Sequence, residues 1–141
     1  MTEAGQIAIA RAHAWVGLIS SSRCLSLFVC FVLRRAAVFL SQGAYPRLGQ
    51  LMTHSHVSMK NDYEISCDEI DCLVDIALEL PGVFGSRMTG GGFGGCTVTL
   101  VAAAEVAKVE EAIIAEYRER TGIEATTIIT RPGLGAAIIK L

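Results

Sequence analysis

The sequence predicts an α+β domain of two layers, in which helices cover one face of an antiparallel sheet. Three observations lead to this fold class. Helical patterns follow one another up to Pro81, short strand patterns dominate after it, and one further helical pattern separates the strands into two pairs. Strands grouped in this way favour an α+β domain over a parallel α/β sheet. With 141 residues, the chain is long enough for one domain with a hydrophobic core.

The first 34 residues form an atypical apolar segment. Its run between Arg23 and Arg34 carries no charge, but it is shorter than the roughly 20 residues that a membrane helix needs. This pattern fits a buried helix or an apolar segment that lacks its normal cover, and the arginine flanks leave interfacial membrane insertion open as a less favoured alternative. We expect the domain proper to span residues 35–141, with residues 1–34 not necessarily native-like and, if exposed, prone to aggregation or partner binding.

Two helices open the regular part of the chain. Residues 35–42 predict a short helix that ends at Gly43, and Pro46 fits the first turn of a longer one. His54 and His56 would point about 200° apart on that helix, so they cannot share a metal ion and are predicted to be structural or exposed. Its predicted buried stripe consists of Leu48, Leu51, Met52 and Met59.

Ser66 and Glu69 predict a capping box at the start of a third helix, which Pro81 and Gly82 end. Its predicted buried stripe is Ile70, Leu73, Val74, Ala77 and Leu78. Its acidic residues are Asp68, Glu69, Asp71 and Asp75. These carboxylates suggest either a metal or catalytic group or, as we prefer, a solvated face that suits a helix N-terminus.

The second half predicts strands and one helix. The helix starts near Glu105 and ends at Gly122, with an inward stripe of Val106, Val109, Ile113 and Tyr117. The strand patterns are, in order, residues 83–88, 96–102, 125–130 and, after a turn at 131–135, 136–140.

Five of the six residues between Thr89 and Cys96 are glycine. Glycine permits positive φ and close approach, and successive N–H groups in such a loop can bind an anion. The spacing Gly90-x-Gly92-x-x-Gly95 fits a dinucleotide fingerprint, but a strand pattern follows where that fingerprint needs a helix, and no Walker A lysine follows either. A phosphate-facing loop and a tight connection between strands therefore both stay open.

Arg87 and Thr89 lead into this loop and could place a cation and a hydroxyl beside a phosphate. Alternatively, Arg87 pairs with an acidic side chain of its own domain. We predict no catalytic residue and no metal ligand in this chain, because no nucleophile–base pair and no metal constellation has suitable spacing.

Net charge and cysteine content limit the classes of binding partner and the cellular location that we expect. A net charge of −2 gives no basic surface for nucleic acid or an anionic membrane. An odd number of cysteines without a C-x-x-C pair or a secretion signal predicts reduced thiols and a cytoplasmic location. The five are Cys24, Cys30, Cys67, Cys72 and Cys96.

Residues 85–98, Gly-Ser-Arg-Met-Thr-Gly-Gly-Gly-Phe-Gly-Gly-Cys-Thr-Val, resemble the third signature motif of the GHMP small-molecule kinases in its galactokinase form. The general pattern is Thr-Gly-x-Gly-x-Gly-Gly, and the flanking Gly-Ser-Arg-Met and Phe93 point to galactokinases. Residues 51–56 and 62–67 resemble two further galactokinase segments. The resemblance covers roughly residues 35–141 and weakens before them.

The resemblance implies a ferredoxin-like C-terminal domain and the transfer of the γ-phosphate of ATP, with Mg²⁺, to the 1-hydroxyl of galactose. It also implies that the glycine-rich loop supports the phosphate end of the active cleft. The cofactor-binding residues so expected are Arg87, Thr89, Gly90, Gly91, Gly92, Phe93, Gly94 and Gly95.

The family's sugar-binding motif, its ATP loop and its catalytic aspartate belong to an N-terminal domain and have no counterpart in this sequence. Phosphoryl transfer needs several such parts at once. We therefore predict a C-terminal portion of a galactokinase that is inactive alone. A non-catalytic galactokinase-like binding or regulatory module and a fragment of an N-acetylgalactosamine kinase stay open as alternatives.

Overall fold

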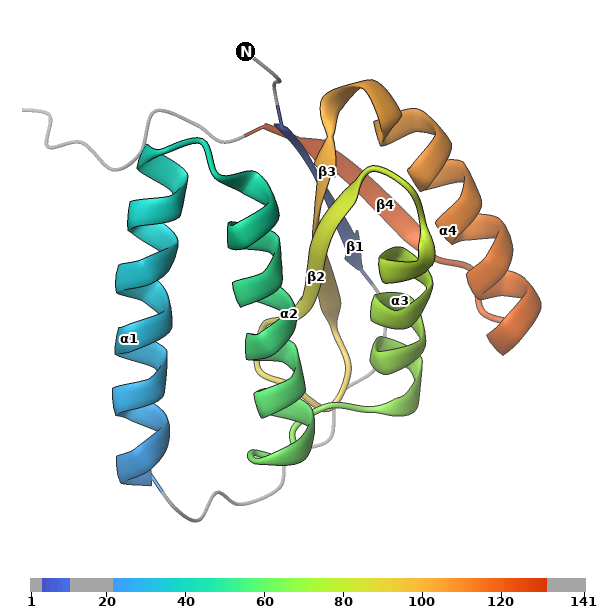
Figure 1. Cartoon of the computed structure of the whole chain (residues 1–141). Coiled ribbons are helices and arrows are strands. Elements are labelled where there is room, and N and C mark those ends of the chain that lie inside the picture. The colour runs from blue at the N-terminus through green and yellow to red at the C-terminus, as the bar shows by residue number, and fades with distance from the viewer. Residues whose placement is uncertain (1–3, 11–21, 132–141) are drawn as a thin grey trace, which may run out of the picture.

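The computed structural model describes residues 4–10 and 22–131 (Figure 1). The elements are β1 (Ala4–Ala10), α1 (Ser22–Ser41), α2 (Tyr45–Asn61), α3 (Asp68–Glu79), β2 (Val83–Thr89), β3 (Cys96–Ala102), a 3₁₀ turn (Ala103–Glu105), α4 (Val106–Thr121) and β4 (Thr126–Thr130). The strands form one sheet in the order β2-β3-β1-β4, and each neighbouring pair is antiparallel. The structure thus confirms the predicted α+β class with an antiparallel sheet.

Two helices form the layer that covers the sheet. α3 packs against β2 and β3, whereas α4 packs against α3 and against β1 and β4 (Figure 1). The core between the layers consists of Ile70, Leu73, Ile76, Ala77, Met88, Val101, Val109, Ile113 and Tyr117. Most of these residues were predicted. Leu78 is an exception, because it is 41% exposed while Ile76 is buried.

β1 corrects the predicted element order, which contained no strand before residue 83. It lies inside the sheet, with Ile7 opposite Thr99 of β3 on one side and Ile129 of β4 on the other. Its sequence, Ala-Gly-Gln-Ile-Ala-Ile-Ala, is rich in alanine, which gives a weak local strand signal. Pairing on both edges with distant strands decides its conformation. The predicted last strand, residues 136–140, lies outside the described residues.

α1 is one continuous helix, not a short helix that begins at residue 35. Arg34 and Arg35 lie within it, because arginine is a good helix former and does not interrupt the pattern. α1 packs against α2 (Figure 1), and Leu33 and Leu40 are 60% and 55% exposed. Of these two residues only Leu33 falls within the apolar segment at residues 1–34, whose character stays a prediction. None of the helices in the described ranges combines the length and apolar character that crossing a membrane requires.

α2 covers the outer edge of β2. Its predicted stripe of Leu48, Leu51, Met52 and Met59 is only half-buried, and the buried positions are Gly49 and His56. A Cβ atom at Gly49 would lie 2.0 Å from the carbonyl oxygen of Phe84, so helix and strand touch through their backbones. An edge strand otherwise exposes unpaired backbone groups. α2 therefore shields the edge that leads into the glycine-rich loop.

Candidate phosphate-binding loop

The loop between β2 and β3 has an unusual backbone. Gly90, Gly92, Phe93, Gly94 and Gly95 all have positive φ, between 57° and 123°. Only glycine adopts this conformation readily, which explains the composition of the loop. A strand follows, as predicted, so the loop is not the strand-to-helix turn of a dinucleotide fingerprint.

The tip of the loop is open and its middle is held. A Cβ atom at Gly90 or Gly91 would meet nothing within 4 Å. Within residues 4–10 and 22–131, the amides of these two residues donate to no backbone carbonyl. The middle differs, because Gly92 is buried against Ile65 and the N–H of Phe93 donates to the Ile65 carbonyl oxygen at 2.6 Å.

Arg87 and Thr89 lie on one face of β2, because side chains alternate along a strand and Ser86 and Met88 are buried. The Arg87 Nε donates to the Met88 carbonyl oxygen at 3.0 Å, and its Nη1 lies 3.5 Å from the Ser55 hydroxyl. Burial lowers the pKa of Arg87. In the part of the chain that the structure describes, none of the ion pairs involves Arg87, so the alternative of an acidic partner finds no support there.

Replacing Gly92 by alanine should lower the free energy of unfolding by about 2 kcal/mol, since a Cβ there would lie 2.7 Å from the Ile65 carbonyl oxygen at a φ of 87°. The matched control is Gly91→Ala, which places the same methyl group in open space. Urea unfolding should leave Gly91→Ala within about 0.5 kcal/mol of the wild type. Equal losses in both variants would contradict the held middle and open tip.

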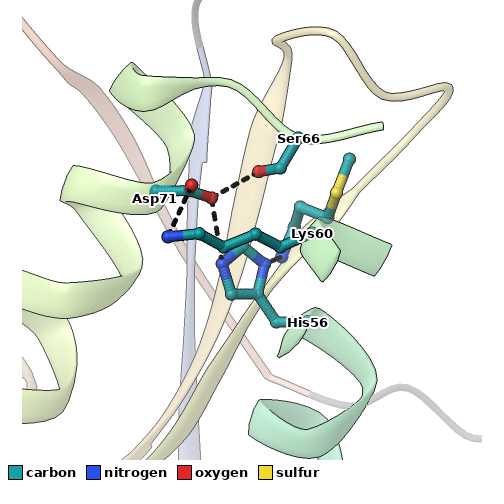
Figure 2. Close-up of polar contacts among 5 residues, drawn as sticks. His56, Lys60, Ser66 and Asp71 are labelled. Atoms are coloured by element: carbon teal, nitrogen blue, oxygen red, sulfur yellow. Dashed lines mark hydrogen bonds and ion pairs between the residues drawn. The ribbon is translucent and has the colours of Figure 1, made fainter. Parts of the chain in front are cut away.

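A polar cluster around the buried His56 lies beside the loop (Figure 2). His56 of α2 and Asp71 of α3 approach to 3.3 Å, between Nε2 and Oδ1, and the Lys60 Nζ lies 2.8 Å from Asp71 Oδ2. The Ser66 hydroxyl donates to Asp71 Oδ1. On its other side, His56 Nδ1 accepts a hydrogen bond from the N–H of Met88 at 3.3 Å. His56 is therefore structural, and its neutral form carries the proton on Nε2.

This cluster corrects two predictions. α3 begins at Asp68 with Cys67 before it, and no side chain caps it, so the capping box of Ser66 and Glu69 is wrong. The Ser66 hydroxyl bonds the Asp71 carboxylate instead. Asp71 is also not part of a solvated face, since its side chain is only 14% exposed. Its tertiary partners outweigh the local preference for solvent.

Burial lowers the pKa of His56 below its ordinary value of 6.5, although Asp71 opposes the shift. Protonation is thus less favourable in the folded state than in the unfolded state. The resulting stability is fully present above the unfolded pKa and is lost as pH falls through the folded pKa. Lys60, Asp71 and Asp75 are the charged groups that act on His56.

We expect the wild type to lose up to about 1.4 kcal/mol more stability than His56→Asn when the pH falls from 7.5 to 5.5. Asparagine does not titrate, so it removes the His56 contribution and leaves the neighbouring carboxylates in place. Urea unfolding at a series of pH values measures the difference. Parallel profiles for the two proteins would contradict the lowered pKa.

The described residues contain no group of three or more histidine, cysteine or acidic side chains that could hold a metal ion. The hydrogen-bond donors in and beside the loop are the open amides of its tip and the Arg87 guanidinium. Both features are donors, and they suit the oxygens of a phosphate.

Most of this domain matches a known protein family. Residues 36–119 match the model of the family described as GHMP kinases C terminal, so the chain belongs to the GHMP kinase C-terminal family. It is 48% identical over 104 residues to a galactokinase of Chloroflexus aurantiacus and 47% identical over 107 residues to one of Homo sapiens. These matches cover 74% and 76% of this chain but only 27% and 26% of the relatives. The chain thus spans about a quarter of their length.

Solved structures agree on the fold. The structure of Lactococcus lactis galactokinase complexed with galactose matches with a TM-score of 0.67 and 36% identity, over 71% of this chain and 26% of that one. A mevalonate kinase of Staphylococcus aureus also reaches 0.67, at 18% identity, over 93% of this chain and 42% of that one. At that identity the second match shows the fold alone.

Proposed function

We propose that this chain is the C-terminal part of a galactokinase-like sugar kinase and that its loop at residues 90–95 contacts the phosphates of ATP. The observation that supports this most is the open tip of Gly90 and Gly91 next to Arg87, a half-buried cation without an acidic partner in the described ranges. The similarity to proteins named galactokinase supports galactose as the sugar. We include a cytoplasmic location in the proposal, because an odd number of cysteines, five, favours reduced thiols.

In this proposal, each part of the loop region has a role in binding and orienting. The tip amides donate to phosphate oxygens, and the positive charge of Arg87 and the Thr89 hydroxyl stand on the strand that leads to them. Catalysis of phosphoryl transfer consists largely of such positioning and charge stabilisation. Mg²⁺ enters as part of the MgATP substrate. The sugar site and the catalytic base come from outside this chain. The chain therefore supplies only part of the active site and is inactive alone.

Two assays of ADP release test the proposal. The purified chain, given galactose and MgATP, should show no turnover. A chimaera in which residues 36–119 replace the matching segment of the human relative should be active. In that chimaera Arg87→Ala should lower kcat/KM by about 100-fold, as loss of a charge-stabilising donor does. Arg87→Lys, which keeps the charge, is the matched control and should lose less.

Turnover by the chain alone at ordinary kinase rates would overturn the assignment as an inactive part. A folded chimaera without activity, or one that Arg87→Ala leaves unchanged, would overturn the role of the loop. An N-acetylgalactosamine kinase stays the alternative for the sugar, because the sugar-binding residues lie outside this chain. The gene sequence upstream of Met1 would decide between the two.

A second candidate, a binding module, is favoured by the exposed apolar side chains of α1. Phe31, Leu33 and Leu40 are each more than half exposed. Their joint replacement by glutamine leaves β1 in place, whereas deletion of residues 1–33 would remove that strand from the sheet. If the exposed apolar face of α1 has no specific partner, the variant should self-associate less than the wild type in size-exclusion chromatography. Loss of a specific partner with unchanged self-association would favour the binding module.

A further inference from the structure

We propose that His56 is a positioning residue for the glycine-rich loop and that the Asp71 carboxylate joins the two points at which the loop is attached. The inference rests on the proposed function, since the loop is positioned for a phosphate. It concerns residues of α2 and α3 that stand outside the loop itself (Figure 2).

The loop is attached at two points, one on each side of its open tip. Before the tip, the N–H of Met88 donates to Nδ1 of His56 at 3.3 Å. After the tip, the N–H of Phe93 donates to the carbonyl oxygen of Ile65 at 2.6 Å. The backbone between these hydrogen bonds includes Gly90 and Gly91, where an added Cβ atom would meet nothing within 4 Å.

The second attachment point carries backbone strain on both sides. Within the described ranges, only two non-glycine residues have positive φ, namely Glu64 at 53° and Phe93 at 57°. Glu64 precedes Ile65, and Phe93 supplies the N–H that Ile65 accepts. Such conformations persist only where the surrounding structure over-determines them. The contact between Ile65 and Phe93 is therefore held against a local preference for other conformations.

Asp71 connects the two points. Because Met88 donates to Nδ1 of His56, the other ring nitrogen carries the proton and donates to Asp71 Oδ1. The hydroxyl of Ser66, the residue after Ile65, donates to the same oxygen. Lys60 neutralises the second oxygen of this carboxylate at 2.8 Å. One carboxylate thus holds the side chain that fixes the start of the loop and the segment that fixes its middle.

Two substitutions of His56 separate a positioning role from a merely structural one. His56→Asn keeps an acceptor near the Nδ1 position, facing the N–H of Met88, and loses the donor to Asp71. His56→Gln does the opposite, since its amide nitrogen replaces Nε2–H and the acceptor for Met88 is lost. Both variants are neutral at every pH, so charge does not distinguish them.

Hydrogen–deuterium exchange of the full chain reads out the position of the loop. His56→Gln should accelerate exchange at residues 88–95 about tenfold, the effect of losing one hydrogen bond, while His56→Asn, which keeps the acceptor for Met88 and loses only the link to Asp71, should accelerate it less. In the chimaera, His56→Gln should raise the KM for MgATP more than it lowers kcat. If His56→Gln fails to fold, Ser66→Ala tests the second attachment point, at Ile65. This variant should accelerate exchange at the same residues.

Equal acceleration by both His56 variants would overturn the inference, because His56 would then act only through general stability. Unchanged exchange in His56→Gln or, where that variant does not fold, in Ser66→Ala would overturn it as well. The exchange measurement does not depend on nucleotide binding. A chimaera that is insensitive to Arg87→Ala would therefore overturn the proposed function, whereas the exchange pattern tests the positioning of the loop by itself.

Discussion

Replacing Gly49 by alanine should lower the free energy of unfolding by about 3 kcal/mol or more. The added Cβ would lie 2.0 Å from the carbonyl oxygen of Phe84 and 2.7 Å from the amide nitrogen of Gly85. These are backbone atoms of β2, so relief requires α2 to move away from the strand, and overpacking of this kind is strongly destabilising. Urea unfolding with an unchanged m-value would measure the loss.

The expected sign makes this a sharp test. Gly49 lies within α2, and helix propensity alone predicts that alanine stabilises such a position by about 1 kcal/mol. Gln50→Ala, at the exposed neighbouring position, is the control and should change stability by no more than about 0.5 kcal/mol. A Gly49→Ala variant as stable as the wild type would show that α2 does not contact β2 through its backbone.

Replacing Asp71 by alanine is the second large expected effect, a loss of about 2 to 3 kcal/mol. His56 would keep a buried Nε2–H without an acceptor, and Ser66 would lose its partner. An unsatisfied buried donor carries the full penalty of its desolvation. Lys60 adds little to this figure, because its side chain is 44% exposed and solvent screens the pair.

Asp75→Ala is the matched control for Asp71→Ala. Asp75 lies one turn further along α3, is exposed and carries the same charge, but it takes part in none of the hydrogen bonds and ion pairs that join Asp71 to His56, Lys60 and Ser66. Thermal or urea unfolding at pH 7 should show a large difference between the two variants. Similar small losses would mean that Asp71 acts only as one more surface charge of this helix.

Much of the fold could be predicted because local patterns agree with it. The strand Cys96–Ala102 was predicted with its bounds, and α4 ends as predicted at Gly122, which has a φ of 73°. The buried residues Val109, Ile113 and Tyr117 follow from helical periodicity alone. In these segments the apolar face and the local conformational preferences favour the same structure.

The wrong predictions concern segments whose conformation is determined by contacts with residues distant in the sequence. β1 has little strand propensity, and it forms because β3 and β4 pair with its two edges. The capping box at Ser66 fails because the part-buried carboxylate of Asp71 accepts the hydrogen bond from the hydroxyl instead. In both cases tertiary contacts override a local signal that was weak or misleading.

For the candidate site, local sequence was enough to predict a glycine-rich loop with Arg87 and Thr89 before it, because the conformational freedom of glycine is a property of short segments. Which part of the loop is open, and which residues hold the rest, depends on long-range packing. Ile65 contacts Phe93 and His56 contacts Met88, in each case more than 25 positions apart along the chain. Periodicity within a helix or strand cannot predict such long-range pairs. Physically, glycine permits the loop conformation, and packing against α2 and α3 selects it.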